Sequence, residues 1–163
     1  MKSLPAAIAA VLTLTSLSVM ADKLPIPTHV PPDFKAECTS CHIAYPPALL
    51  AASDWQRIMG ALDKHYGDNA SLDDKARQTI EDFLVRNARK PKKDMATDSV
   101  SDALPRLTTA NWFKRKHHEV ARNDWTHAKV KSAANCAGCH TRAGEGSFRE
   151  REIVMPDGRK WEG

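Results

Sequence analysis

The sequence contains few aromatic residues and only one long apolar run. Of its 163 residues, 6% are aromatic, and the mean hydropathy is −0.48. A chain with so little apolar material builds a small core, and small domains already bury a low share of their surface. The formal net charge of +4 is too small for the basic surface of a nucleic-acid-binding protein. We therefore expect no nucleic-acid partner, and we expect something other than side chains to fill part of the interior.

The one long apolar run lies near the start of the sequence and has the form of a secretory signal peptide. Lys2 precedes small and apolar residues from Leu4 to Val19. This run is shorter than the ~20 residues that a membrane-spanning helix needs, although a membrane anchor is the alternative. Val19 and Ala21 suit the small-residue positions of a cleavage site. We predict a signal peptide over 1–21, cleaved after Ala21, and a periplasmic mature chain without stable membrane insertion.

The four cysteines fall into two copies of one pattern, C-x-x-C-H, which is the attachment pattern for c-type haem. Two thiols about one helical turn apart can each form a thioether with one vinyl group of a haem. The histidine that follows then lies under the iron as its proximal ligand. We therefore predict two covalently attached haem c groups, with every cysteine used for attachment. The two motifs are Cys38-Thr39-Ser40-Cys41-His42 and Cys136-Ala137-Gly138-Cys139-His140.

Other uses of paired cysteines fit this pattern less well. Two local disulfides would not need a histidine after each pair. A four-cysteine zinc site usually separates its pairs by ~15–20 residues, whereas the gap from Cys41 to Cys136 is far longer. A thioredoxin-like redox pair would need a βαβ pattern nearby, and no strand alternation persists in the sequence. The haem interpretation is therefore the one that the spacing favours.

Helical periodicity is the main regular pattern between the motifs. Residues 22–36 are rich in proline and predict an extended lead-in. Ser53 and Gln56 form a potential capping box at the start of a helix, and a short helix should carry the second motif near 133–140. The three longer predicted helices run from Ser53 to about Tyr66, from Ser71 to about Asn87, and from about Thr109 to Arg122.

These elements predict a mostly α, two-lobed c-type cytochrome, with short helices packed around two haems and long connecting loops. We expect a first haem lobe at 22–87, a polar linker at 88–108 and a second haem lobe at 109–163, although 22–163 could form one compact domain. The linker contains a basic cluster, for which partner docking is an alternative to simple solvation. This cluster is Arg89, Lys90, Lys92 and Lys93.

The sixth position of the first iron has one strong candidate ligand. His65 shares the apolar face of its predicted helix with Ile58 and Leu62. An iron must lie nearby, so a histidine on that face is expected to bind it. His29, in the proline-rich lead-in, is expected at the surface.

The second iron has several candidates. His117 shares an apolar helical face with Phe113 and Val120. His118 points about 100° away on a helix, and His127 lies nine residues before the second motif. Met155 is a weaker candidate, because a methionine ligand normally needs a longer loop to wrap the haem. His117 is the favoured ligand, with His118 and His127 left open.

Beyond the motifs, the chain resembles the small dihaem cytochrome c family of bacteria over about residues 36–156. Thr39 and Tyr66 stand where glycine and phenylalanine are expected, and neither position is a ligand. The matching stretches are Glu37–His42 with Ala44–Pro47, Ser53–Trp55, Leu62–Gly67 with Asn69–Leu72, Trp112-Phe113 with His117, and Asn135–His140 with Ala143, Gly146 and Phe148.

The resemblance implies that both irons are bis-histidine ligated, by His42 with His65 and by His140 with His117. It also implies low-potential electron transfer, often with a membrane cytochrome b or a high-spin monohaem cytochrome as partner. The leading hypothesis is thus a periplasmic electron shuttle rather than an enzyme. The alternatives are a haem enzyme or gas-binding protein with one open iron, and a haem subunit of a larger oxidoreductase.

Overall fold

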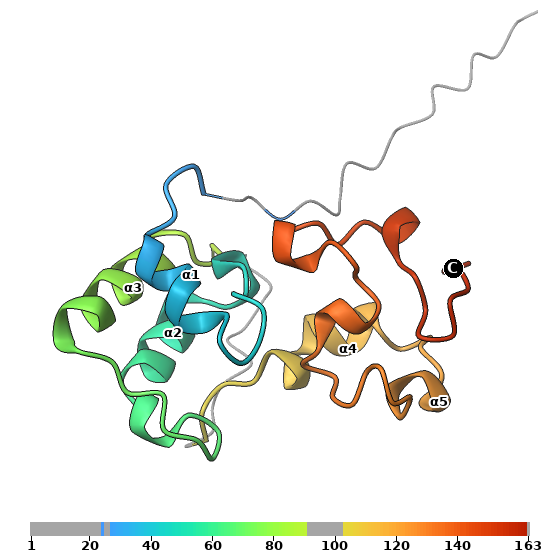
Figure 1. Cartoon of the computed structure of the whole chain (residues 1–163), viewed down its shortest axis with the longest axis horizontal. Helices are drawn as coiled ribbons and strands as arrows, with labels where there is room; N and C mark the ends of the chain where they lie inside the picture. The colour runs from blue at the N-terminus through green and yellow to red at the C-terminus, as the bar shows by residue number, and fades with distance from the viewer. Residues whose placement is uncertain (1–23, 25–26, 91–102, 163) are drawn as a thin grey trace, which may run out of the picture.

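The computed structural model describes residue 24, residues 27–90 and residues 103–162 (Figure 1). The predicted signal peptide, Lys92, Lys93 and Met95 lie outside these ranges. Within them the chain forms short helices, and β-pairing is limited to isolated bridges. No helix in these ranges is long and apolar enough to cross a membrane. The predicted fold class, mostly α and two-lobed, is confirmed: α1, α2 and α3 gather in one lobe, and α4 and α5 lie in the other (Figure 1).

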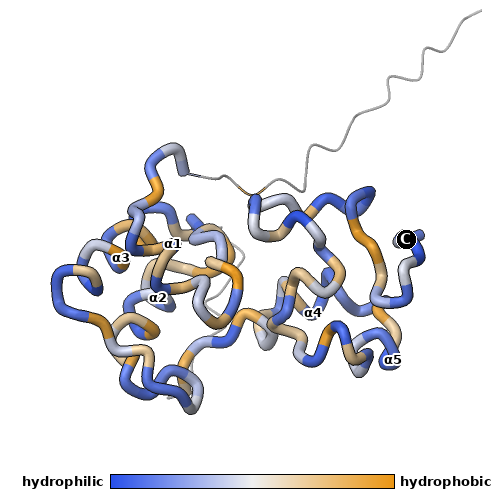
Figure 2. Tube along the Cα trace, viewed as in Figure 1, coloured by the Kyte–Doolittle hydropathy of each residue, from blue (hydrophilic) through white to orange (hydrophobic). Residues whose placement is uncertain are grey.

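The first lobe is built on α3, which packs against both α1 and α2. Hydrophobic and hydrophilic residues are interspersed along the chain in both lobes (Figure 2). The helices α1, α2 and α3 span Pro32–Cys38, Ala52–Met59 and Asp74–Arg86, and the 3-10 turns η1 and η2 span Pro47–Leu49 and Leu62–Lys64. The core of the first lobe consists of Phe34, Leu50, Trp55, Ile58, Met59, Ile80, Phe83 and Leu84.

Helix α1 corrects the prediction that residues 22–36 are irregular. It begins at Pro32, where proline is favoured because the first helical position needs no N–H donor and the ring presets φ. The buried Phe34 anchors the helix, since its ring lies 4.8 Å from that of Phe83. The last residue of α1 is Cys38, so this helix positions the first cysteine of the first motif.

Helix α2 is shorter than predicted, and its capping box does not form. Its N-cap is Ala51, which has no capping side chain, and it ends at Met59 rather than near Tyr66. Gly60, a poor helix former, follows as the C-cap. The chain then continues through η2, so His65 lies in a separate turn instead of on α2. Tyr66 adopts a left-handed conformation with φ of 55°.

Helix α3 begins three residues later than the sequence predicts. Asp73, not Ser71, is the N-cap, and its carboxylate accepts a hydrogen bond from the Ala76 amide at 3.0 Å. At the other end the helix stops at Arg86 with Asn87 as the C-cap, as predicted. The buried face of α3 carries Ile80, Phe83 and Leu84 into the core.

The second lobe has shorter helices than predicted. The helix expected from Thr109 to Arg122 is confined to Asn111–Lys116, because His117 leaves the helical region at φ −121° and ψ 15°. The second motif begins in a 3-10 turn rather than on an α-helix. The helices and 3-10 turns described from residue 107 onward are η3 (Leu107–Thr109), α4 (Asn111–Lys116), α5 (Arg122–Trp125), η4 (Cys136–Gly138), η5 (Ala143–Glu145) and η6 (Glu150–Glu152).

Residues 103–108, which belong to the predicted linker, contact the first lobe. Leu107 packs against the first-lobe core. Arg57 donates a hydrogen bond to the Ala103 carbonyl at 2.6 Å, and the Tyr66 hydroxyl donates to the Pro105 carbonyl. The described end of the predicted linker is therefore attached to the first lobe, while the lobe boundaries themselves stay a prediction.

Candidate haem-binding sites

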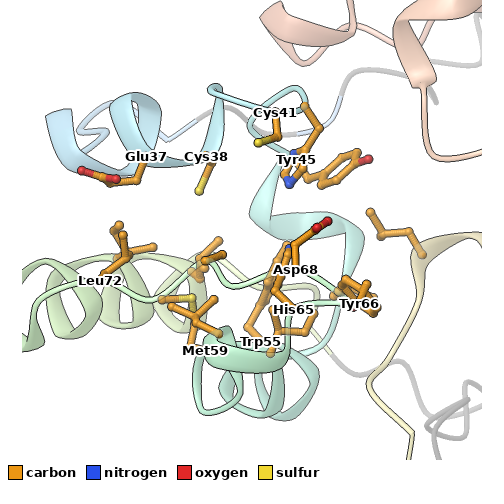
Figure 3. A pocket seen from close by; sticks show the side chains of 18 of the residues that line it. Glu37, Cys38, Cys41, Tyr45, Trp55, Met59, His65, Tyr66, Asp68 and Leu72 are labelled. Carbon is orange, nitrogen blue, oxygen red and sulfur yellow. The ribbon is translucent and has the colours of Figure 1, made fainter.

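A cavity of about 560 Å³ lies beside the first motif (Figure 3). Cys38 and Cys41 lie on one side of it, and His65 and Met59 lie on the opposite side. The remaining lining is mostly apolar and comes from α2, α3 and the 103–108 segment. The cavity is therefore lined by two thiols (Cys38 and Cys41), two imidazoles (His42 and His65) and apolar side chains. A covalently held haem requires this set of groups.

The two predicted axial histidines of the first site face each other across this cavity. Their ring centroids are 6.3 Å apart, and the ring planes differ by 24°. A metal–imidazole bond of about 2 Å, plus about 1 Å from nitrogen to ring centre, on both sides spans about 6 Å. The spacing of His42 and His65 thus suits a single metal ion between them. His42 Nδ1 donates to the Ile43 carbonyl at 2.6 Å, which leaves Nε2 as the ligand atom.

The second site repeats this arrangement in the other lobe. The rings of His117 and His140 have centroids 6.1 Å apart, but their planes differ by 80°. His117 Nδ1 donates to the Phe113 carbonyl at 2.8 Å, and the Phe113 ring stacks on the imidazole at 4.0 Å. Phe148 lies 5.1 Å from the His140 ring. Both sites therefore place two imidazoles at the same separation, with different relative orientations.

Burial favours the neutral, ligand-competent form of both distal histidines. Desolvation lowers the pKa of His65, and the nearby His42 lowers it further while Asp68 opposes the shift. Desolvation likewise lowers the pKa of His117, against the hydrogen bond to Phe113. Neutral imidazole is the form that binds metals, so both side chains are ready to coordinate at neutral pH.

The four thiols are available for attachment. All four cysteines are free of disulfides. Burial raises the pKa of Cys38 and of Cys136 to about 11 in each case. Thioether formation adds a thiol across a vinyl double bond, so that sulfur bonds to one carbon and hydrogen to the other without any net oxidation. The residues present therefore fit haem c at both motifs.

The rival candidates for the second iron make other contacts. His118 is exposed, and its Nδ1 donates to the Arg115 carbonyl at 2.9 Å. His127 Nδ1 accepts from the Lys129 amide at 3.2 Å. Met155 is buried, and its amide bonds to the Arg159 carbonyl. The structure brings His117 opposite His140, as predicted; its role as an iron ligand stays a prediction, as does that of His65. His29 is exposed, as expected.

The two sites have the same chain spacing in opposite order. His65 follows His42 by 23 residues (65 minus 42), and His117 precedes His140 by 23 residues (140 minus 117). The two segments 42–65 and 117–140 do not overlap. Each candidate iron therefore joins only residues of its own lobe.

Three residues that contact the first site were assigned no role there in the sequence analysis. Tyr45 stacks on His42 with centroids 4.7 Å apart and planes 23° apart, and Tyr66 meets the His65 ring edge-on at 4.8 Å. The guanidinium of Arg106 lies 4.5 Å from the centre of the Tyr66 ring. The tyrosines could have been noticed, because they are the only two in the chain and each lies within three residues of a candidate ligand. Arg106 carried no such signal within the predicted linker.

Two covalent attachment motifs, each with a second histidine opposite its own, define a c-type cytochrome with two haems. The chain matches the model of the dihaem cytochrome c family over residues 34–148 and belongs to that family. It therefore carries two haem c groups, as predicted.

Solved structures of dihaem cytochromes resemble most of the chain. One from Shewanella baltica OS155 shares 36% identity with a TM-score of 0.69, covering 82% of this chain and 100% of its own. One from Rhodobacter sphaeroides shares 42% identity with a TM-score of 0.60, covering 74% of this chain and 98% of its own. A search among curated proteins found no match.

Proposed function

We propose that this protein is a periplasmic electron-transfer protein in which both irons are bis-histidine ligated and low-spin. The observation that carries the proposal is the pair of imidazole separations, 6.3 Å for His42 with His65 and 6.1 Å for His117 with His140. Each separation suits one iron with an imidazole on either side. Haem supplies one-electron exchange when bound.

Ligation on both faces leaves no position for a substrate or a gas. With haem bound, His42 and His65 would hold the first iron and His117 and His140 the second, and haem would supply one-electron exchange. A methionine in one axial position would raise the reduction potential, so two imidazoles support a low potential. Hydrogen bonds from His42 to Ile43 and from His117 to Phe113 make those imidazoles better donors and act in the same direction.

Export and redox partners complete the proposal. The apolar run and the small residues before Asp22 support cleavage after Ala21 and a periplasmic location. Partners of the kind expected from the family are a membrane cytochrome b or a monohaem cytochrome. Mass spectrometry of the protein from a periplasmic extract should find Asp22 as the first residue. An intact N-terminus in a membrane fraction would contradict this part of the proposal.

Paired histidine variants test the ligation. His117→Ala should give a high-spin second iron that binds carbon monoxide after reduction, whereas the adjacent His118→Ala should keep the low-spin spectrum of the parent. In the first lobe, His65→Ala should open the iron, with the exposed His29→Ala as the control. Optical and low-temperature EPR spectra measure all four variants. Carbon monoxide binding by the unaltered protein would instead support an enzyme or gas-binding protein with one open site.

A further inference from the structure

The chain's only two tyrosines each join an axial histidine of the first site to the C-terminal part of the chain. Tyr45 stacks on His42, and its hydroxyl donates to the Ala134 carbonyl at 2.7 Å. Tyr66 packs against His65, and its hydroxyl donates to the Pro105 carbonyl. Both sides of the first iron are thus tied to residues that lie beyond the first lobe in sequence.

The two hydrogen bonds, here called the Tyr45 bridge and the Tyr66 bridge, end in different parts of the chain. Ala134 lies two residues before Cys136, and its carbonyl also accepts the Cys136 amide at 3.0 Å. One carbonyl oxygen therefore receives both the Tyr45 hydroxyl and the main chain of the second haem-attachment motif. Pro105, by contrast, belongs to the segment that packs on the first lobe and is 31 residues from that motif (136 minus 105). Only the Tyr45 bridge reaches the second haem site.

We propose that Tyr45 is a positioning residue that holds the second attachment motif against the proximal ligand of the first haem, and that this contact sets the rate of electron exchange between the two haems. The connection runs from the His42 ring to the Tyr45 ring, through the hydroxyl to Ala134, and on to the Cys136 amide. This inference rests on the proposed electron-transfer function.

The exchange itself requires no chemistry on the tyrosine. One electron passes from the ferrous iron at one site to the ferric iron at the other. No bond forms or breaks, and Tyr45 keeps its proton and its electrons. Electron transfer weakens steeply with distance and is faster across bonds and hydrogen bonds than across gaps, so loss of the hydroxyl contact should slow it.

The test compares Tyr45→Phe with Tyr66→Phe in the full, haem-loaded protein. Each variant keeps its ring beside a histidine and loses one hydroxyl bond to a main-chain carbonyl, so the two are matched in structural cost. Low-spin spectra and melting temperatures confirm that ligation and folding are intact in both. The rate of intramolecular exchange is measured on half-reduced protein by two-dimensional exchange NMR, with pulse radiolysis as a second method.

We expect several-fold slower exchange in Tyr45→Phe and parental exchange in Tyr66→Phe. Equal slowing in both variants would show general loosening and would overturn the proposed role of Tyr45, as would parental exchange in both. Failure of the proposed function gives a different result, namely carbon monoxide binding or a high-spin iron in the unaltered protein, regardless of the state of Tyr45.

Discussion

Ring orientation distinguishes the two pairs of histidines more than ring separation does. The planes of His42 and His65 lie 24° apart, and those of His117 and His140 lie 80° apart. Contacts with neighbours hold these orientations: Tyr45 stacks on His42, and Phe113 stacks on His117. Nearly parallel imidazoles donate into the same iron d orbital and separate it in energy from its partner, whereas perpendicular imidazoles leave the two orbitals close in energy.

The two oxidised haems should therefore give different low-spin EPR signals. We expect a rhombic signal from the first site and a strongly anisotropic signal with a large principal g value from the second. Low-temperature EPR measures both, and the histidine variants assign them: His65→Ala should remove the rhombic signal, and His117→Ala the anisotropic one. Two rhombic signals of the same shape would contradict the difference in ring angle.

Arg106 supplies positive charge at the first site, since it lines the cavity and lies over the Tyr66 ring. A nearby cation disfavours the more positive ferric state, so Arg106→Gln should lower the reduction potential of the first haem. The side chain is exposed and well solvated, so the shift should be on the order of tens of millivolts. A redox titration measures it.

The control for Arg106→Gln is Arg86→Gln, which removes the same charge from an exposed i,i+4 pair with Asp82 on α3. We expect both potentials to stay at their parental values in this variant. An equal shift in both variants would assign the effect to net charge rather than to the position of Arg106.

At the scale of elements, α3 depends on a cap that differs from the one expected. Asp73→Ala should lower the free energy of unfolding by about 1 kcal/mol, because the Ala76 amide loses its acceptor. Ser71→Ala should have little effect, since Ser71 lies outside the helix. Chemical denaturation of the haem-loaded protein compares the two, and a larger loss in Ser71→Ala would contradict the assigned cap.

Helical periodicity identified the faces of the elements better than their ends. It placed His65 and His117 on apolar faces, and both lie opposite the motif histidines in the structure. Neither is inside the helix that was predicted to carry it, because the chain leaves the helical conformation at Ala61 and at His117. The first break follows Gly60, a poor helix former that the helical periodicity did not take into account.

Contacts between segments far apart in the chain could not be predicted from local sequence patterns. The bond from Tyr45 to Ala134 spans 89 residues, and that from Tyr66 to Pro105 spans 39. The prolines of residues 22–36 did not predict α1, because proline is common both in extended segments and at the first turn of a helix. The buried Phe34 decided between the two.

At the scale of the whole molecule, the haems replace part of the core. Without haem, the apolar wall of the 560 Å³ cavity would face water instead of the group that covers it. Folded domains of this size are stable by only about 5–15 kcal/mol. The haem-free protein should therefore be largely unfolded.

Far-UV circular dichroism of a variant without its attachment cysteines measures how much helix the haem-free protein keeps. Replacing all four cysteines by alanine should remove most of the helical signal. The control Ser40→Ala, within the first motif, should bind haem and keep the parental helical signal. A helical, cooperatively melting haem-free chain would contradict the expectation.

Each predicted distal histidine lies in the same lobe as its motif, so the proposed ligation would close two separate loops, 42–65 and 117–140, in one chain. Bis-histidine ligation, as proposed, would stabilise each lobe separately, because it forms in the folded state and is lost on unfolding. Because neither loop is nested in the other, opening one leaves the other closed. Cooperativity between the lobes then depends on contacts such as the Tyr45–Ala134 hydrogen bond, and without them the molecule would unfold in two steps.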